Sequence, residues 1–381
     1  MSDTRILRGR GVVLTVLVGA LLGLTGCGTA ASSTTDIAPP AAVDRSDGLR
    51  IDGELVADRE LYEAARGGSV TLYTSGSQQS ETAISERFTE ETGIPLTFTR
   101  LATAKMTERV QSLAGADRLD ADVIRTADPA FADRLARSGV LVPYDPPSVD
   151  ALVAAGAMQA GRPVISCYSM AYAFAYNNRV VPPQQAPRRW ADLLDPRWGD
   201  GRLGTARPTG AGSAPTDFVN RHFGPQYWQR MAANGVRVFD AGVAVQADAL
   251  ARGEIAVGTF PADVAFAAGR AGAPITFVVP EDPDAKLSLA VLSLGMTPVG
   301  LENPAARVFV NWSMSKAAQR FAAAQAYVPA RTDLGPLPDV PFGLPQLGTP
   351  GVEPFTLADQ LARKDEALAI WNAAFRFRPG S

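Results

Sequence analysis

The 381-residue chain is poor in the residues from which most metal sites and covalent active sites are built. It contains two cysteines, Cys27 and Cys167, and a single histidine, His222. Cys27 is assigned below to lipidation, so Cys167 has no partner for an intramolecular disulfide, and one thiol cannot form a zinc site. A catalytic histidine needs a nucleophile and an orienting acid, whereas His222 lies in a stretch typical of a corner between two helices. We therefore expect no metal, no cofactor and no catalytic residue.

Motifs of phosphate-dependent or hydrolytic enzymes are also missing. The sequence has no Gly-rich phosphate loop, no Ser/His/Asp set and no metal-ligand cluster, so we expect that the protein is not an enzyme. Positive charge is not in excess, because 36 Lys and Arg stand against 39 Asp and Glu, a formal net charge of −3. A nucleic-acid partner requires a basic stripe, and we therefore expect no nucleic-acid partner.

The N-terminus has the layout of an export signal. Arg5, Arg8 and Arg10 precede an uncharged, mostly apolar stretch, 11–24. This stretch is short for a membrane span of about 20 residues and suits the apolar core of a signal peptide. Leu24-Thr25-Gly26-Cys27 follows and resembles the bacterial lipobox, whose cysteine is acylated. We predict a lipoprotein signal peptide over 1–26 with Cys27 as the lipidation site. The alternative is an ordinary secretory signal in which Cys27 has no role.

The residues after Cys27 are small and polar, with prolines and aspartates further on. Such a segment cannot bury enough apolar surface to fold, and we predict a flexible tether over 27–50. The protein is then secreted and held by its lipid on the outer face of the cytoplasmic membrane, in the cell envelope or periplasm. We expect it to be a monomer.

Strands and helices alternate at short spacing in the body of the chain. The patterns predict strands at 69–73, 96–99 and 121–124 and helices at 81–92, 106–113 and 129–138. This alternation is typical of an α/β fold with mainly parallel sheets and helices on both faces.

The mature chain, about 330 residues, is too long for one ordinary core and suits two lobes. A stretch over 166–176, with aromatic residues largely at period two, predicts a long strand that leaves the first lobe, and 288–292 predicts the returning strand. Two such crossings form a hinge with a cleft between the lobes. The predicted ranges are 51–178 and 281–345 for lobe 1, 179–280 for lobe 2 and 346–381 for a C-terminal extension.

Several stretches in order resemble the iron(III)-type family of periplasmic or extracellular solute-binding proteins of ABC importers. They include Val70-Thr71-Leu72-Tyr73, the helix 85–94, Ala175-Tyr176-Asn177-Asn178, the stretch 189–198 that begins Arg189-Trp190-Ala191-Asp192, and 232–238, 251–255, 303–306 and 327–331. The resemblance covers about residues 69–335. It implies the two-lobed type II periplasmic binding protein fold, an ABC permease as partner, and capture of a small solute by hinge closure.

One departure from that family concerns its metal. Iron-binding members carry two adjacent tyrosines just after the strand that corresponds to 255–258, and this chain has Phe260 and Pro261 there. Many members also place a histidine in the first loop, where this chain reads Ser75-Gly76-Ser77-Gln78. We therefore favour a solute other than free Fe(III). Tyr168, Tyr172 and Tyr176 could supply phenolates in principle, although aromatic residues on a hinge strand are more often core or cleft wall.

Candidate solute contacts in lobe 1 follow two strands. The loop after the first strand supplies the hydroxyls of Thr74, Ser75 and Ser77, with Gln78 beside them, at a helix N-terminus that can cradle an anion. The alternative is that a serine here only caps the helix. The turn 126–129 supplies Thr126 as a contact and Asp128 as the helix cap, while Arg125 could be a salt-bridge residue that points away.

Candidate contacts in lobe 2 include a cation. Arg207 offers a bidentate fork for phosphate or carboxylate, and Gly212 and Ser213 permit close approach of the backbone at a helix start. The alternative for Arg207 is a surface arginine on a loop. Asp263 could bind an ammonium group or cap its helix, and Tyr176 could contact an amine or hydroxyl.

These residues favour a small organic phosphate, phosphonate or carboxylate as the solute. Fe(III) or an Fe(III) chelate is one alternative, and an extracellular sensor or partner-presenting lipoprotein with the same fold is another. Neighbouring genes for a permease and an ATPase would favour transport over sensing.

Overall fold

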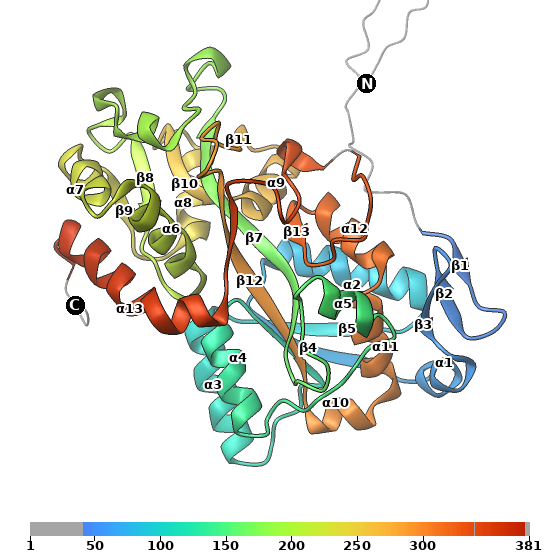
Figure 1. Ribbon diagram of the computed structural model, residues 1–381. Helices are drawn as coiled ribbons and strands as arrows, with labels where there is room; N and C mark the ends of the chain where they lie inside the picture. The colour runs from blue at the N-terminus through green and yellow to red at the C-terminus, as the bar shows by residue number, and fades with distance from the viewer. Residues whose placement is uncertain (1–40, 339, 378–381) are drawn as a thin grey trace, which may run out of the picture. The chain divides into compact units, whose positions relative to one another are not determined.

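The computed structural model describes residues 41–338 and 340–377 (Figure 1). The described residues belong to one compact unit, 37–381. The predicted signal peptide, the lipidation site Cys27 and residues 27–40 of the predicted tether therefore lie outside the described residues. Among the helices that are described, none is long and apolar enough to cross a membrane.

The chain is folded from Val43 onward, which corrects the predicted end of the tether at residue 50. Three short antiparallel strands form a small sheet: β1 (Val43–Asp44), β2 (Leu49–Ile51) and β3 (Glu54–Ala57). Leu49, Ile51 and Val56 are fully buried in the core of lobe 1, next to α1 (Arg59–Ala65). The prediction was wrong here because these three apolar side chains give an otherwise polar stretch enough surface to bury.

Lobe 1 is built on three parallel strands in the order β5-β4-β6: β4 (Val70–Thr74), β5 (Leu96–Arg100) and β6 (Val123–Thr126). The helices that follow them are α2 (Gln78–Thr92), α3 (Thr103–Gly115) and α4 (Pro129–Arg137). Further helices of this lobe are α5 (Val149–Ala154), α10 (Pro298–Glu302), α11 (Pro304–Ser313) and α12 (Lys316–Ala324). The three predicted strand–helix pairs are confirmed.

Lobe 2 repeats the alternation. Its strands are β8 (Leu203–Ala206), β9 (Arg237–Phe239), β10 (Val257–Pro261) and β11 (Ile275–Val278). Its α-helices are α6 (Ser213–Phe223), α7 (Gln226–Ala233), α8 (Val243–Ala251) and α9 (Ala262–Arg270). Short 3₁₀ turns are η1 (Pro183–Gln185), η2 (Trp190–Leu194), η3 (Pro196–Trp198) and η4 (Gly210–Gly212). The strands β10, β8 and β9 pair in parallel.

Two long strands carry the chain between the lobes, as predicted. β7 (Ile165–Asn177) leaves lobe 1 and β12 (Leu287–Met296) returns to it. They pair antiparallel with each other, β12 also pairs antiparallel with β6, and β7 pairs antiparallel with β10. One sheet therefore runs through both lobes in the order β5-β4-β6-β12-β7-β10-β8-β9. It is mixed rather than mainly parallel, because each crossing strand opposes the strands of the lobe that it joins.

The C-terminal residues belong to the body of the protein, which corrects the prediction of an extension over 346–381. β13 (Tyr327–Pro329) pairs with β7, a 3₁₀ turn η5 (Pro341–Gly343) follows, and β14 (Val352–Phe355) pairs in parallel with β12. The last helix, α13 (Leu357–Ala374), packs on α6 of lobe 2 and on α4 of lobe 1 (Figure 1). Buried Ala367 and Trp371, one helical turn apart, fix its inner face.

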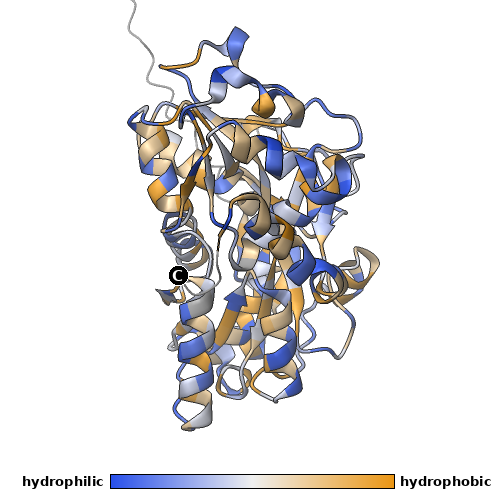
Figure 2. Cartoon of the chain, turned by 90° about the vertical axis from the view of Figure 1, so that its left-hand side faces the viewer, coloured by the Kyte–Doolittle hydropathy of each residue, from blue (hydrophilic) through white to orange (hydrophobic). Residues whose placement is uncertain are grey.

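Each lobe has an apolar core of its own. In lobe 1, Phe88 packs edge-on against Phe309 and Trp312. In lobe 2, Trp190 contacts Phe174 and Phe218. Figure 2 shows hydrophobic residues concentrated along the strands and the inner helix faces, with hydrophilic residues in the outer loops. Burial of these two cores fixes the two-lobed architecture.

Candidate functional site

The first loop of lobe 1 begins at the carboxyl end of β4. Thr74 is fully buried, and its hydroxyl donates a 2.7 Å hydrogen bond to Glu81 Oε1 and accepts one of 3.0 Å from the Gly76 N–H. The Ser75 hydroxyl accepts a 2.9 Å hydrogen bond from the Ala127 N–H, which joins this loop to the turn after β6. The hydroxyls of Thr74 and Ser75 therefore shape the loop from inside, through protein partners.

Ser77 and Gln78 begin helix α2. Ser77 is its N-cap and accepts a 3.3 Å hydrogen bond from the Ser80 N–H, which is the capping role that we gave as the alternative. Gln78 is exposed. Ser77 also lies beside Asp263 of lobe 2. Hydrogen bonding from the Ser77 hydroxyl is one of the effects that lower the pKa of the Asp263 carboxyl. The two lobes thus meet at the N-termini of α2 and α9.

The turn after β6 is held by its own side chains. Asp128 caps α4 as predicted, accepting a 3.1 Å hydrogen bond from the Phe131 N–H. The Thr126 hydroxyl accepts a 3.2 Å hydrogen bond from the Asp128 N–H. Thr126 is buried, so its hydroxyl stabilises the turn.

A buried polar cluster lies where lobe 1, the crossing strands and lobe 2 meet. It consists of Glu81, Arg125, Tyr168, Asp263 and Tyr327. Arg125 forms a fully buried ion pair with Glu81, so the salt-bridge alternative for this residue is confirmed, and its guanidinium stacks 5.3 Å from the centre of the Tyr168 ring. Tyr327 donates a 3.3 Å hydrogen bond to Asp263 Oδ2, which joins the strand β13 to lobe 2.

Burial dominates the electrostatics of this cluster. It raises the pKa of Asp263 to about 6, against the lowering effect of the Tyr327 hydroxyl. It also raises the pKa of the Tyr168 and Tyr327 hydroxyls well above their ordinary value. Several of its buried polar atoms have no partner among the described residues: Arg125 Nε and Nη1, the Tyr168 hydroxyl and Asp263 Oδ1. Unpaired buried groups of this kind are costly and often mark a site of function.

A second feature is a cavity of about 100 Å³ in lobe 2, at the carboxyl end of β8. Arg207 lies on its wall beside Gly212, and the hydroxyls of Thr205 and Thr259 meet on it at 2.8 Å. The indole N–H of Trp190, another wall residue, is buried without a partner. The described wall residues include no carboxylate. The cavity therefore carries a few hydroxyl and indole groups and one guanidinium on an otherwise mostly apolar wall.

Tyr172 connects the cavity to the polar cluster. It lies on the cavity wall, and its pKa is raised first by burial and then by the charge of nearby Asp263. The predicted contact Tyr176 instead lies in the core of lobe 2, where only 6% of it is exposed. Both tyrosines share one face of β7, since the period of a strand is two, and the cleft is level with Tyr172. Tyr176 is therefore two repeats of the strand away from Tyr172 and is not among the described wall residues of this cavity.

The C-terminal segment covers Arg207. The guanidinium of Arg207 lies 3.7 Å from the centre of the Phe377 ring, and Trp371 of α13 lines the same cavity. Arg207 is thus a half-buried loop arginine whose guanidinium is covered on one side by an aromatic ring. Ser213, the first residue of α6, is buried at the edge of the site, next to Gly212.

The places of the family's metal ligands are filled by other chemistry. Phe260 is fully buried in the core of lobe 2, and Pro261 ends β10. No group of three or more His, Cys, Asp or Glu residues that could hold a metal ion occurs in the described part of the chain. His222 lies in the last turn of α6, just before the corner that leads to α7, and its Nε2 is 2.9 Å from Glu353 Oε1.

Sequence reasoning missed several wall residues. Thr205, Thr259 and Trp190 lie in strands or turns whose pattern predicts only secondary structure, and their approach depends on the parallel pairing of β8 with β10. Glu81 and Tyr327 reach the polar cluster from segments about 250 residues apart in the chain. A buried charge inside a helix, such as Glu81, is the one available signal, because such residues are seldom buried unless paired.

The chain is similar to a known protein family and to several solved structures. A family model described as bacterial extracellular solute-binding protein matches residues 70–327. Among solved structures, iron-bound HitA from Pseudomonas aeruginosa is similar with 20% identity and a TM-score of 0.62, covering 81% of this chain and 99% of its own.

Two further structures have the same fold. The substrate-binding protein of an ABC transporter from Agrobacterium tumefaciens is 16% identical with a TM-score of 0.68, covering 81% of this chain and 94% of its own. AfuA from Actinobacillus pleuropneumoniae, with fructose-6-phosphate bound, is 17% identical with a TM-score of 0.56, covering 82% of this chain and 99% of its own. At these identities the similarity shows the fold.

Proposed function

The chain belongs to the family of bacterial extracellular solute-binding proteins, and on that premise we propose that it captures a small organic phosphate, phosphonate or carboxylate between its lobes for an ABC permease. The observation that carries this proposal is the cavity beside Arg207, whose described wall has hydroxyl, indole and guanidinium donors and no carboxylate. Donors of this kind stabilise an oxyanion, and an arginine binds one with two parallel hydrogen bonds.

The size of the cavity fits the head group of a solute. Its volume of about 100 Å³ is well below the roughly 300–1,000 Å³ of pockets for drug-sized ligands. We propose that Arg207, Thr205 and Thr259 hold the oxyanion, with the backbone at Gly212 and Ser213 close by. The remainder of the solute then lies toward Tyr172 and Asp263, where an unpaired carboxylate oxygen can accept a hydrogen bond from a hydroxyl or amine.

The residues of lobe 1 that we proposed as solute contacts mainly fix the conformation of the loops that border the cleft. Thr74, Ser75 and Thr126 hold the loops, and Ser77 and Gln78 present the N-terminus of α2 to the cleft. The bound fructose-6-phosphate of AfuA supports an organic phosphate, because the two proteins share the fold. We further propose that residues 1–26 are a signal peptide, that Cys27 carries the lipid anchor, and that the mature protein is a monomer.

Iron is the second candidate. Iron-bound HitA and the ferric binding protein from Campylobacter jejuni share the fold, and Tyr168, Tyr327 and Asp263 bring oxygen donors together in the polar cluster. Phe260 and Pro261 weigh against it, since neither has a side-chain donor atom. A sensor with the same fold is the third candidate.

The test of the proposal is Arg207→Ala. Isothermal titration of residues 37–381 with inorganic phosphate, methylphosphonate, glycerol 3-phosphate and citrate should give at least one ligand whose affinity falls tenfold or more in the variant. This corresponds to the roughly 1.5–3 kcal/mol of a hydrogen bond to a charged group.

The matched control is Arg270→Ala, which removes an arginine that also stacks on a phenylalanine of lobe 2, Phe266, but lies outside the cavity. Its affinity should equal that of the unmodified protein. Equal affinities for all three proteins would exclude Arg207 from the site.

A further inference from the structure

Helix α13 is in contact with both lobes. Its first turns lie beside α4 of lobe 1, and its later turns pack on α6 and α7 of lobe 2 (Figure 1). It starts directly after β14, which pairs with the crossing strand β12. The chain therefore crosses the hinge once more after the two long strands, and it does so next to the cavity of Arg207.

The lobe-1 end of α13 is held by few polar contacts. Gln360 is 3% exposed; its Oε1 accepts a 2.6 Å hydrogen bond from the Ala130 N–H, and its Nε2 donates one of 2.9 Å to Asp128 Oδ1. Lys364 Nζ lies 3.7 Å from Asp128 Oδ2. The Ala130 N–H belongs to the first turn of α4, where backbone donors have no partner inside the helix. A side chain of α13 thus occupies the helix end that faces the cleft.

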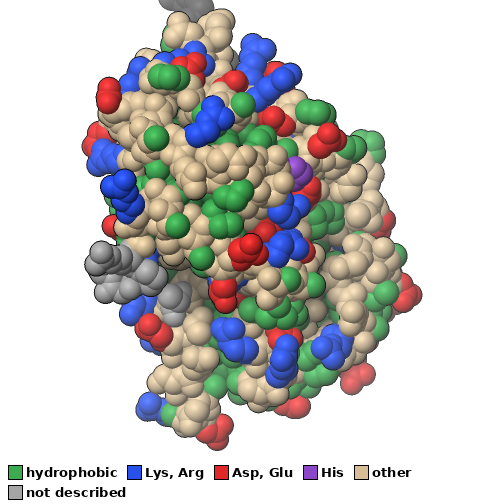
Figure 3. Space-filling view, turned by 60° about the vertical axis from the view of Figure 1, so that its left-hand side comes forward, with side chains coloured by type: hydrophobic (Ala, Val, Ile, Leu, Met, Phe, Trp, Pro, Cys, Tyr) green, Lys and Arg blue, Asp and Glu red, His purple; other side chains and the backbone are tan. Residues whose placement is uncertain are grey.

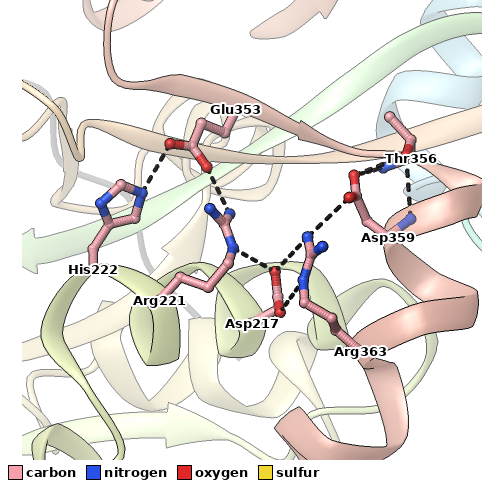
Figure 4. A network of polar contacts seen from close by, with 7 residues as sticks. All are labelled: Asp217, Arg221, His222, Glu353, Thr356, Asp359 and Arg363. Carbon is pink, nitrogen blue, oxygen red and sulfur yellow. Dashed lines mark hydrogen bonds and ion pairs between the residues drawn. The ribbon is translucent and has the colours of Figure 1, made fainter.

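The lobe-2 end is held by a network of ion pairs (Figure 4). Asp217 of α6 accepts two hydrogen bonds from Arg363, of 2.9 and 3.2 Å, and a third of 2.9 Å from Arg221. Arg221 also donates a 2.6 Å hydrogen bond to Glu353 of β14. Figure 3 shows acidic and basic side chains alternating over this face beside the histidine. The network fastens both β14 and α13 to α6.

Apolar burial adds to the lobe-2 end. Trp371 is 1% exposed in the lobe-2 core and stacks on Phe375, with ring centres 4.4 Å apart. Separating α13 from lobe 2 would expose a buried aromatic side chain and also break the hydrogen bonds of Arg363 with α6, whereas separating it from α4 breaks the two hydrogen bonds of Gln360 and the ion pair of Lys364. When the lobes separate, α13 therefore remains with lobe 2, and the contacts of Gln360 and Lys364 with α4 are the ones that break.

We propose that α13 is an interlobe latch, in which Gln360 and Lys364 hold the N-terminus of α4 and so keep the cleft closed. The latch regulates access to the solute site and in that sense rests on the proposed function, but the motion of the lobes is a property of the chain alone. Closure by the latch lowers the number of contacts that a solute must supply, and it also slows entry of the solute.

The test measures the distance between the lobes without any solute. Spin labels at Lys105→Cys on α3 and Gln229→Cys on α7, both exposed, report the separation by pulsed electron resonance in residues 37–381. Cys167 is fully buried and stays unlabelled. The unmodified latch should give one narrow, short distance distribution.

The latch variants are Gln360→Ala with Lys364→Ala, and separately Gln360→Glu, which keeps the size of the side chain but opposes Asp128. Both should add a longer distance and raise the ratio of open to closed molecules roughly tenfold, the change expected for one hydrogen bond to a charged group. Glu366→Ala, an exposed position of α13, is the control and should leave the distribution unchanged.

An unchanged distribution in both latch variants, with far-ultraviolet circular dichroism like that of the unmodified protein, would overturn the latch. Opening in the variants supports it even if the ligand titrations of Arg207→Ala fail, so the two proposals are separable. Opening in Glu366→Ala as well would also overturn it, because no hydrogen bond or ion pair between Glu366 and α4 is found among the described residues.

Discussion

Buried polar side chains, among them Asp263, lie at the meeting point of the lobes. Asp263 is 1% exposed and has one oxygen without a partner. Water is excluded from this carboxyl, so its charged form is disfavoured and its pKa is raised to about 6. The ionisation of Asp263 therefore couples the stability of the fold to pH.

Stability should fall as pH rises through the range in which Asp263 ionises. The folded carboxyl has a pKa of about 6, above its ordinary 3.8, so the folded state binds more protons than the unfolded state between these values. The free energy of unfolding then decreases from about pH 4 to about pH 6 and stays lowered above, by at most about 3 kcal/mol.

The side chain at position 263 in the variant Asp263→Asn cannot ionise, so this decrease in the free energy of unfolding with pH should not occur in it. Its stability relative to the unmodified protein should increase between pH 4 and pH 8, measured by urea unfolding at both values. Asp240→Asn, at an exposed position of lobe 2, should show no such increase. A relative stability of Asp263→Asn that is flat with pH would contradict the burial of this charge.

Single residues show both the reach and the limit of sequence reasoning. The helix cap Asp128 follows from local chemistry and could be predicted, and so could the position of Arg207 after a strand of lobe 2. The sequence could not show that Tyr172 rather than Tyr176 lines the cavity, because a period of two gives the face of a strand and not the level along it. The ion pair of Glu81 with Arg125 joins separate elements, and no local pattern contains that information.

At the scale of elements, the alternation of strands and helices in lobe 1 was predictable because each has its own apolar period and its own stop signal. The small sheet β1–β3 was not, since its strands have two to four residues and apolar residues are sparse in that stretch. Helix α13 carries a capping box, Thr356 with Asp359, but its place across the hinge depends on tertiary contacts with α4 and α6.

The small N-terminal sheet should contribute to stability. Leu49→Ala removes a fully buried side chain and should lower the free energy of unfolding by about 2–5 kcal/mol, the usual cost of such a cavity. Chemical unfolding in urea measures it.

The control on the same strand is Arg50→Ala, whose side chain is exposed. It should change stability by no more than about 0.5 kcal/mol. If Leu49→Ala also left the free energy of unfolding unchanged, residues up to 50 would behave as the flexible tether that composition alone suggested.

At the scale of the whole molecule, length and the two crossing strands were enough to predict two lobes and a hinge. They could not show that the sheet is continuous through both lobes, because pairing of β12 with both β6 and β7 is a property of register and not of composition. Nor could they show that the C-terminus crosses back and covers Arg207. Three neighbouring connections therefore cross the hinge, and the cavity beside Arg207 lies next to the last of them.

The identity of the bound solute is the central test of the proposed function. The most direct measurement is the melting temperature of residues 37–381 in the presence of organic phosphates, phosphonates, carboxylates, Fe(III) and Fe(III)-citrate. A ligand that binds only the native state stabilises it by mass action, so we expect a small oxyanion to raise the melting temperature and Arg207→Ala to remove that shift. If Fe(III) alone raised the melting temperature and gave the colour of a tyrosinate–iron complex, the proposal of an oxyanion solute would be contradicted.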